Sequence, residues 1–166
     1  VGISLPGIVD SEAGILRYSH ILDLRDVPLS LLSRCIPYPC RFINDANAAG
    51  FAEIYGTPTA GNLIYLSLSN SIGGAILTDG ALYMGDHLRA GEFGHNTLVP
   101  GGRRCYCGKD GCLDAYCSAR LLSDGADGNL AAFFGGLREG DAAKQAVWRE
   151  YLEHLAIAVN NLHMSF

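Results

Sequence analysis

Three cysteines are crowded into the stretch Cys105-Tyr-Cys107-Gly-Lys-Asp-Gly-Cys112, and His95 lies ten positions before the first of them. Cys105 and Cys107 are too close together to form an easy disulfide with each other. Three thiolates need a fourth ligand to complete a tetrahedral zinc site, and a glycine-rich bend can bring His95 back to supply it. The pattern therefore predicts a structural zinc ion held by His95, Cys105, Cys107 and Cys112, with reduced, unliganded thiols as the alternative. Four protein ligands leave no position for a reactive water, so zinc hydrolysis is not predicted.

Acidic residues flank this cluster on both sides. Glu92 and His95 share one bend in Ala90-Gly-Glu-Phe-Gly-His95, and Asp114 follows the last cysteine by two residues. A zinc-supported loop that orients Glu92, His95 and Asp114 around one pocket can read sugar hydroxyl groups, because the wrong epimer leaves polar groups unpaired. The alternative for each carboxylate taken alone is a solvated surface charge.

A further acidic residue follows the short strand expected at residues 41–43, where Asn44-Asp45 opens a helix expected at residues 46–55 and closed by Gly56. Ligands of α/β sheets bind at the carboxyl ends of strands. A carboxylate there can accept the proton of a sugar hydroxyl that attacks a phosphate. An ordinary helix cap is the equal alternative.

The remaining pattern alternates strands and helices. Before Asn44 the sequence predicts a strand pair over residues 2–9, broken at Pro6-Gly7, and a helix over residues 29–36. After it we expect strands at 62–68 and 72–78, a hairpin turn at Asp79-Gly80, an irregular stretch at 85–111, and helices at 113–122 and 141–164. The last helix should bury one face made by Val147, Tyr151, Leu155, Ala158 and Leu162. This order predicts an α/β fold with a mixed sheet.

Composition limits the function classes. The 166 residues are 49% hydrophobic and 17% charged, with a net charge of −5, which indicates a globular chain. An acidic surface does not favour nucleic acid, so any DNA contact should come from residues outside this segment. The sequence has neither an apolar run long enough for a membrane span nor a signal peptide, which predicts a cytoplasmic protein. Val1 and Phe166 lie inside expected elements, so we expect the interior of a longer protein.

Together these motifs resemble the ROK family of sugar-responsive repressors and sugar kinases. Cys105-x-Cys-Gly-x-x-Gly-Cys-Leu113 resembles the family's zinc signature, and Gly91-Glu-x-Gly-His95 resembles its sugar-binding motif. Asn44-Asp-Ala-Asn47 is similar to its catalytic-loop motif, and Ser4-Leu-Pro-Gly7 is similar to the early strand whose glycine lies against the sugar. The resemblance covers nearly the whole chain.

The resemblance implies the actin-like, ribonuclease H-like sugar kinase fold, with residues 1–166 as an interior part of it. A phosphate loop or DNA-binding domain would precede the segment, and the C-terminal end of the domain would follow it. It further implies dimers or tetramers, a zinc ion held by the four residues above, and Asp45 as the catalytic base of a kinase. The implied sugar-binding residues are Gly7, Asn44, Asp45, Glu92, His95 and Asp114.

Two departures from the family pattern bear on function. Kinases of the family usually carry Gly-Thr-Gly-x-Gly-Gly in the second phosphate-binding turn, whereas this chain has Ser69-Asn-Ser-Ile-Gly-Gly74. Gly73 and Gly74 remain as a degenerate phosphate-binding pair, but the added side chains lie where backbone should approach phosphate. The family's glutamate after Leu113 is also shortened to Asp114.

These departures favour the sugar-sensing domain of a transcriptional repressor that binds a sugar or sugar phosphate. The first alternative is an ATP-dependent sugar kinase of the glucokinase type, using Mg-ATP with Asp45 as general base. The second is a zinc-stapled interaction module without a small ligand, which explains the crowded polar motifs poorly.

Overall fold

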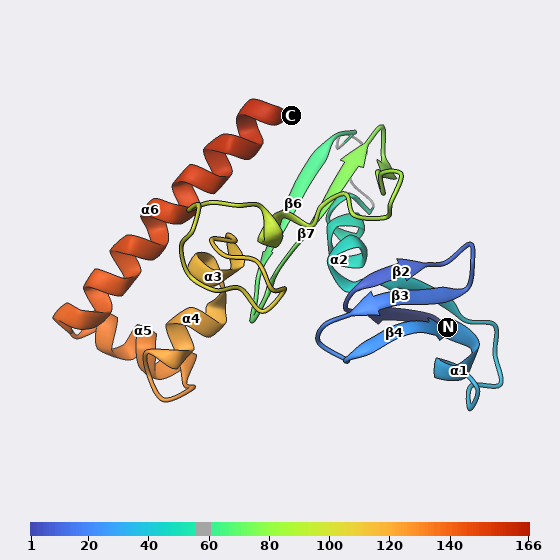
Figure 1. Cartoon of the computed structure of the whole chain (residues 1–166), viewed down its shortest axis with the longest axis horizontal. Coiled ribbons are helices and arrows are strands. Elements are labelled where there is room, and N and C mark those ends of the chain that lie inside the picture. Colours follow the sequence, from blue (N-terminus) through green and yellow to red (C-terminus); the bar gives the residue numbers. More distant parts are fainter. Residues whose placement is uncertain (56–60) are drawn as a thin grey trace. The chain divides into compact units, whose positions relative to one another are not determined.

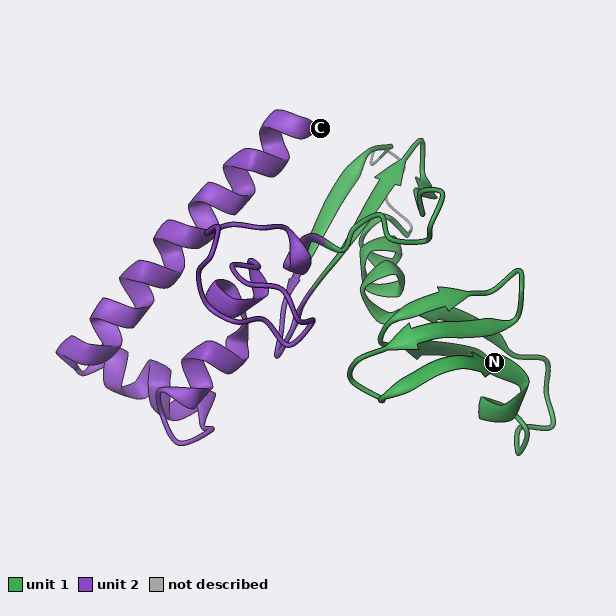
Figure 2. Ribbon diagram, in the orientation of Figure 1, with its two compact units in different colours: residues 1–66, 73–92 green, residues 67–72, 93–166 purple. Residues whose placement is uncertain are grey.

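The computed structural model describes residues 1–55 and 61–166, which form two compact units. Unit 1 comprises Val1–Leu66 and Gly73–Glu92, and unit 2 comprises Ser67–Ile72 and Phe93–Phe166 (Figure 2). The α/β class predicted from the sequence is confirmed, with parallel and antiparallel strand pairs in separate sheets (Figure 1).

Unit 1 begins with five short strands. β1 (Gly2–Leu5) pairs in parallel with β5 (Arg41–Asn44), which places Leu5 beside Asn44. β2 (Ile8–Asp10), β3 (Ile15–Ser19) and β4 (Leu24–Pro28) form an antiparallel sheet around Val9, Leu16 and Leu29. The break at Pro6-Gly7 is therefore confirmed, whereas β3 and β4 were not predicted from the sequence.

Two helices of unit 1 compare differently with their predictions. The helix expected at 29–36 is too long, because α1 (Leu29–Leu32) ends before Ser33. Pro37 disfavours the helical conformation for Ile36, which instead closes a turn onto the Ser33 carbonyl. α2 (Asp45–Ile54) agrees with the expected helix, and its predicted closure at Gly56 lies outside the described residues.

A third sheet follows, in the order β6 (Leu63–Leu68), β7 (Ile72–Thr78) and β8 (Ala81–Leu82). The predicted hairpin turn is confirmed: Asp79 and Gly80 have φ values of 52° and 75°, as a type I′ turn requires. Helix α2 packs closely here, because a Cβ at Gly50 would lie 2.6 Å from the Ala75 Cβ.

Besides Ser67–Ile72, unit 2 consists of the 3-10 turn η1 (Phe93–His95), a loop and four helices. The single helix expected at 113–122 is wrong, because Ser118 is extended and separates α3 (Asp114–Cys117) from α4 (Ala119–Asp124). α5 (Leu130–Arg138) was not predicted. In Figure 1, α5 lies against α6 (Ala142–Ser165), the longest helix described.

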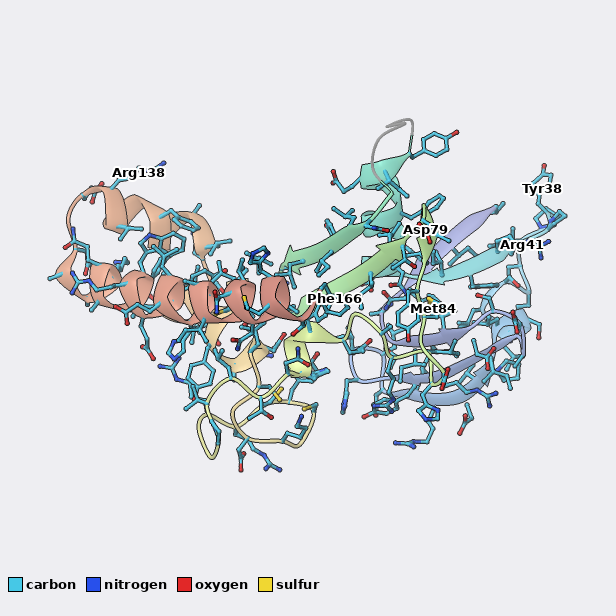
Figure 3. All side chains as sticks on the ribbon, turned by 90° about the horizontal axis from the view of Figure 1, so that it is seen from above. Tyr38, Arg41, Asp79, Met84, Arg138 and Phe166 are labelled. Atoms are coloured by element: carbon cyan, nitrogen blue, oxygen red, sulfur yellow. The ribbon has the colours of Figure 1, made fainter. Side chains whose placement is uncertain are left out.

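Helix α6 confirms its prediction. Of the face predicted to be buried, Tyr151, Ala158 and Leu162 are buried, whereas Val147 and Leu155 are only partly buried. At its C-terminal end Phe166 (Figure 3) meets Phe93 edge to face, with ring centroids 6.3 Å apart. Among residues 1–55 and 61–166, no helix combines the length and the apolar character that a membrane span requires.

Candidate functional site

The four predicted metal ligands come together in unit 2. The Nδ1 or Nε2 atom of His95 and the Sγ atoms of Cys105, Cys107 and Cys112 all lie within 4.8 Å of one another. The Cys105 Sγ is 3.8 Å from His95 Nδ1, and the Cys107 and Cys112 sulfurs are 3.7 Å apart.

These spacings fit a tetrahedral zinc ion. Bonds of about 2.3 Å to sulfur and about 2.0 Å to nitrogen place the ligand atoms about 3.5 to 3.8 Å apart in a tetrahedron. Cys105 and Cys112 are buried and no disulfide joins the described cysteines. The donor set, one imidazole and three thiols, is the kind that zinc prefers in structural sites.

The loop reaches this geometry through a tight hairpin. Cys105 N–H donates to the Lys109 carbonyl, and Gly108 N–H donates back to the Cys105 carbonyl, at 2.8 and 3.1 Å. Gly108 and Gly111 have φ values of 93° and 81°, a conformation that glycine adopts readily. At Gly111 a side chain would also collide with the Val99 carbonyl, so this glycine lets two loop strands approach.

The thiols differ electrostatically. Burial raises the pKa of the Cys105 thiol to about 12 and also raises the pKa of Cys112. Burial acts to raise the pKa of Cys107 too, but the Lys109 backbone N–H and the two neighbouring thiols outweigh it, so that pKa is lowered. A bound divalent cation favours the thiolate form of each ligand and reverses the effect of burial.

Asp114 has a structural partner. It is buried at the start of α3, and its Oδ1 accepts a 2.5 Å hydrogen bond from the Ile72 backbone N–H. One carboxylate oxygen therefore supports the turn that joins β6 to β7. The predicted sugar contact of Asp114 stays a prediction.

In unit 1 the predicted sugar-binding residues meet at the start of α2. Asn44 caps this helix by accepting from Asn47 N–H, and its amide donates to the Gly7 carbonyl, both at 2.9 Å. Gly7 has a φ of 112°, and a side chain there would collide with the Tyr18 carbonyl. The cap interpretation of Asn44 is thus confirmed.

Asp45 and Glu92 give this part of unit 1 its charge. Asp45 is exposed on the first turn of α2, where its Oδ1 accepts from Ala46 N–H. Glu92 is half-buried, and burial raises its pKa; the Arg89 charge opposes this shift and the Asp45 charge adds to it. The two carboxylates therefore lie within electrostatic range of each other.

The glycines predicted to approach phosphate lie in β7. Gly74 is buried, and Gly91 (φ 87°) lies so close that a Cβ would be 2.7 Å from the Gly74 carbonyl oxygen. Gly74 thus lies against the backbone of Gly91, next to Glu92. Asn47 belongs to the motif Asn44-Asp-Ala-Asn47, but no role of its own was predicted for it from the sequence. It is buried, and its amide donates to the Met84 sulfur at 3.4 Å (Met84 is labelled in Figure 3).

Comparison with known families gives the same family as the sequence motifs. The sequence profile of the ROK family matches residues 1–166. The chain belongs to the ROK family. The predicted actin-like sugar kinase fold is also confirmed, because solved ROK structures superpose on nearly the whole chain.

Relatives of this ROK chain include both kinases and repressors. A glucokinase of Halalkalibacterium halodurans is 34% identical over 133 residues, which cover 75% of this chain and 40% of that protein. A xylose repressor of Caldicellulosiruptor bescii is 34% identical over 125 residues, covering 74% of this chain and 31% of the repressor. The chain thus spans less than half the length of these relatives.

Solved structures include a ROK family glucokinase from Streptomyces griseus in complex with glucose and AMPPNP. It has a TM-score of 0.84 and 27% identity, with 99% of this chain and 61% of that chain covered. Another is a ROK family transcriptional regulator, a homologue of Escherichia coli Mlc, with 24% identity and a TM-score of 0.80. The match covers 97% of this chain and 46% of the regulator chain, and it shows the shared fold.

Proposed function

We propose that this chain is the sugar-sensing part of a ROK-family transcriptional regulator. The observation that carries the proposal is the turn Ser69-Asn-Ser71 between β6 and β7. A phosphate-binding turn needs bare backbone N–H groups that can approach the phosphate closely. Here all three residues of the turn carry side chains, and the Ser71 hydroxyl lies 2.8 Å from the Tyr106 hydroxyl, within a hydrogen bond.

The effector would be a sugar or sugar phosphate. In unit 1, Asp45 and Glu92 offer carboxylate acceptors, and Asn44 holds the Gly7 backbone at the end of β1. Carboxylates and fixed backbone groups can pair with several sugar hydroxyls and so reject epimers. His95 and Asp114, in unit 2, remain predicted sugar-binding residues.

Zinc would support the loop rather than react. Four protein ligands, His95, Cys105, Cys107 and Cys112, would close its coordination shell and supply folding energy to a loop with little secondary structure. DNA binding would come from residues outside this segment, because the segment is acidic. Assembly into dimers or tetramers and a cytoplasmic location stay predictions.

A sugar kinase is the second candidate, favoured by the exposed Asp45 carboxylate. Asp45 lies at the N-terminus of α2, close enough for its charge to act on Glu92. A carboxylate so placed can accept the proton of a sugar hydroxyl that attacks the γ-phosphate of Mg-ATP.

Calorimetric titration of the protein with a panel of sugars and sugar phosphates, together with ATP turnover assays, separates the two candidates. We expect binding of at least one sugar, negligible ATP-dependent phosphorylation and weak nucleotide binding. A variant with Ser69→Gly, Asn70→Thr and Ser71→Gly should gain nucleotide affinity, because it restores the glycine turn. Sugar-dependent ATP consumption that Asp45→Asn abolishes would establish the kinase instead.

A further inference from the structure

Tyr106 links the metal cluster to the turn between β6 and β7. It lies between two metal-ligand cysteines, and its hydroxyl is 3.4 Å from His95 Nε2 and 2.8 Å from Ser71 Oγ. The His95 and Tyr106 rings also meet edge to face, with centroids 5.3 Å apart. All three residues belong to unit 2.

The two nitrogens of His95 face different partners. Nδ1 faces the Cys105 sulfur at 3.8 Å, and Nε2 faces the Tyr106 hydroxyl. A neutral imidazole has one donor and one acceptor nitrogen, so a metal ion at Nδ1 requires the proton on Nε2. When no sugar is bound to His95, Nε2–H can then donate to the Tyr106 oxygen, which leaves the Tyr106 proton to donate to Ser71.

The turn has further tethers beside the metal ligands. The Ile72 N–H donates to Asp114, which lies two residues after Cys112, and the Ala119 N–H donates to the Ser69 carbonyl at 2.7 Å. The tethers from Tyr106 and Asp114 therefore come from residues whose backbone positions depend directly on the metal loop.

We propose that Tyr106 is a positioning residue that couples metal occupancy to the conformation of the Ser69–Ile72 turn. A metal ion fixes the His95 tautomer and ring, His95 orients the Tyr106 hydroxyl, and Tyr106 holds the Ser71 side chain through a hydrogen bond. The coupling is reciprocal, so the turn in its anchored conformation also strengthens metal binding. The inference rests on the zinc site proposed above, not on the choice between regulator and kinase.

The expected size follows from similar hydrogen bonds to metal-bound histidines. Losing such a partner typically lowers metal affinity about 10- to 100-fold. Tyr106 is 43% exposed, so water can replace part of its hydrogen bond. We therefore expect Tyr106→Phe to weaken zinc binding about tenfold, at the lower end of that range.

Two measurements on the natural full-length protein test the proposal: zinc affinity by competition with a chromogenic chelator, and amide hydrogen exchange of residues 67–72. Tyr106→Phe should lower the affinity, and in the zinc-loaded protein it should speed exchange in the turn. Ser71→Ala cuts the same link from the other end and should also speed exchange. The double variant should bind zinc no more weakly than Tyr106→Phe, because both changes remove one linked interaction.

Tyr83→Phe is the matched control, since Tyr83 is an exposed tyrosine of unit 1. It should change neither measurement. The coupling would be overturned if Tyr106→Phe bound zinc with wild-type affinity. It would also be overturned if neither Tyr106→Phe nor Ser71→Ala changed the amide hydrogen exchange of residues 67–72. A wild-type protein that binds no zinc would overturn the metal proposal and this inference together. Neither readout depends on sugar, ATP or DNA, so a failed regulator proposal would leave the result standing.

Discussion

At the scale of single residues, Glu92 has the clearest electrostatic signature in the proposed sugar site. Burial raises its pKa, Arg89 partly offsets the rise, and Asp45 adds to it. The raised pKa means that Glu92 takes up a proton at a higher pH than an ordinary glutamate. A protonated Glu92 loses much of its strength as an acceptor for a sugar hydroxyl.

Sugar affinity should therefore fall as the pH is lowered, starting above the ordinary glutamate range of about 4.3. Glu92→Gln should bind sugar about tenfold or more weakly at neutral pH, because it loses a charged acceptor worth about 1.5 to 3 kcal/mol. Its affinity should also lose most of the pH dependence. Calorimetric titration at a series of pH values measures both effects.

The contribution of Glu92 to folding stability depends on pH in the opposite direction from its contribution to sugar affinity. A raised pKa contributes stability that is present below the unfolded-state pKa and is lost as pH rises through the folded-state value. Glu92→Gln should thus leave the neutral-pH melting temperature unchanged or slightly raised. Glu53→Gln, at an exposed position of α2, is the control. If sugar affinity depended on pH equally in Glu92→Gln and in the wild type, the group that titrates would have to be a residue other than Glu92.

Sequence spacing predicted the cluster of His95 with three cysteines but not the contacts around it. Cys105, Cys107 and Cys112 are close in the chain, so their short spacing alone keeps the three thiols near one another. The contact between Ser71 and Tyr106 joins residues 35 positions apart, and nothing local marks it. The buried hydrogen bond of Asp114 to Ile72 was hidden for the same reason.

At the scale of elements, the misjudged helices show where local pattern yields to tertiary structure. The residues around Ser118 suit a helix, yet the helix is interrupted there. The Ala119 N–H donates instead to the Ser69 carbonyl, elsewhere in the same unit. Helix α5 contains Gly135-Gly136, which weakens a helix prediction. It forms because Phe133 is fully buried and Phe134 packs edge to face on Trp148 of α6.

Phe133 should accordingly be among the costliest positions of unit 2 to truncate. Phe133→Ala leaves a cavity under α5, and such changes lower the free energy of unfolding by about 3 to 5 kcal/mol. Leu152→Ala, at a 44% exposed position of α6, should cost far less. Denaturant unfolding of both variants measures the difference. Equal costs would show that α5 contributes little to the core of unit 2.

At the scale of the whole molecule, family membership followed from motif order, while the extra strands and helices needed the structure. The sugar, zinc and catalytic-loop motifs can be recognised in the sequence because few other residue types could replace their key members, such as Gly7, Gly91 and the cysteines. β3 and β4 contain the charged residues Arg17, Arg25 and Asp26, which concealed them. They become strands because their alternate residues, such as Leu16 and Val27, close the Val9 core.

Metal removal tests how far the loop of unit 2 depends on its proposed ion. Residues 96–112 have little regular structure, so zinc ligation would supply much of their folding energy. Treatment with a strong chelator should release about one zinc per chain and lower the melting temperature. Cys107→Ser should prevent zinc binding and lower the melting temperature similarly, whereas Cys35→Ser, at an exposed cysteine, should retain the ion.

Hydrogen exchange adds the location to this measurement. After zinc release, protection should fall first in residues 93–117, which contain the four ligands and the start of α3. The strands β1 to β5 carry no ligand and have their own core around Leu16, so they should keep their protection longer. Elemental analysis that finds no metal in a fully stable wild-type protein would refute the zinc site. A melting temperature unaffected by release of the ion would instead leave a bound metal without its proposed structural role.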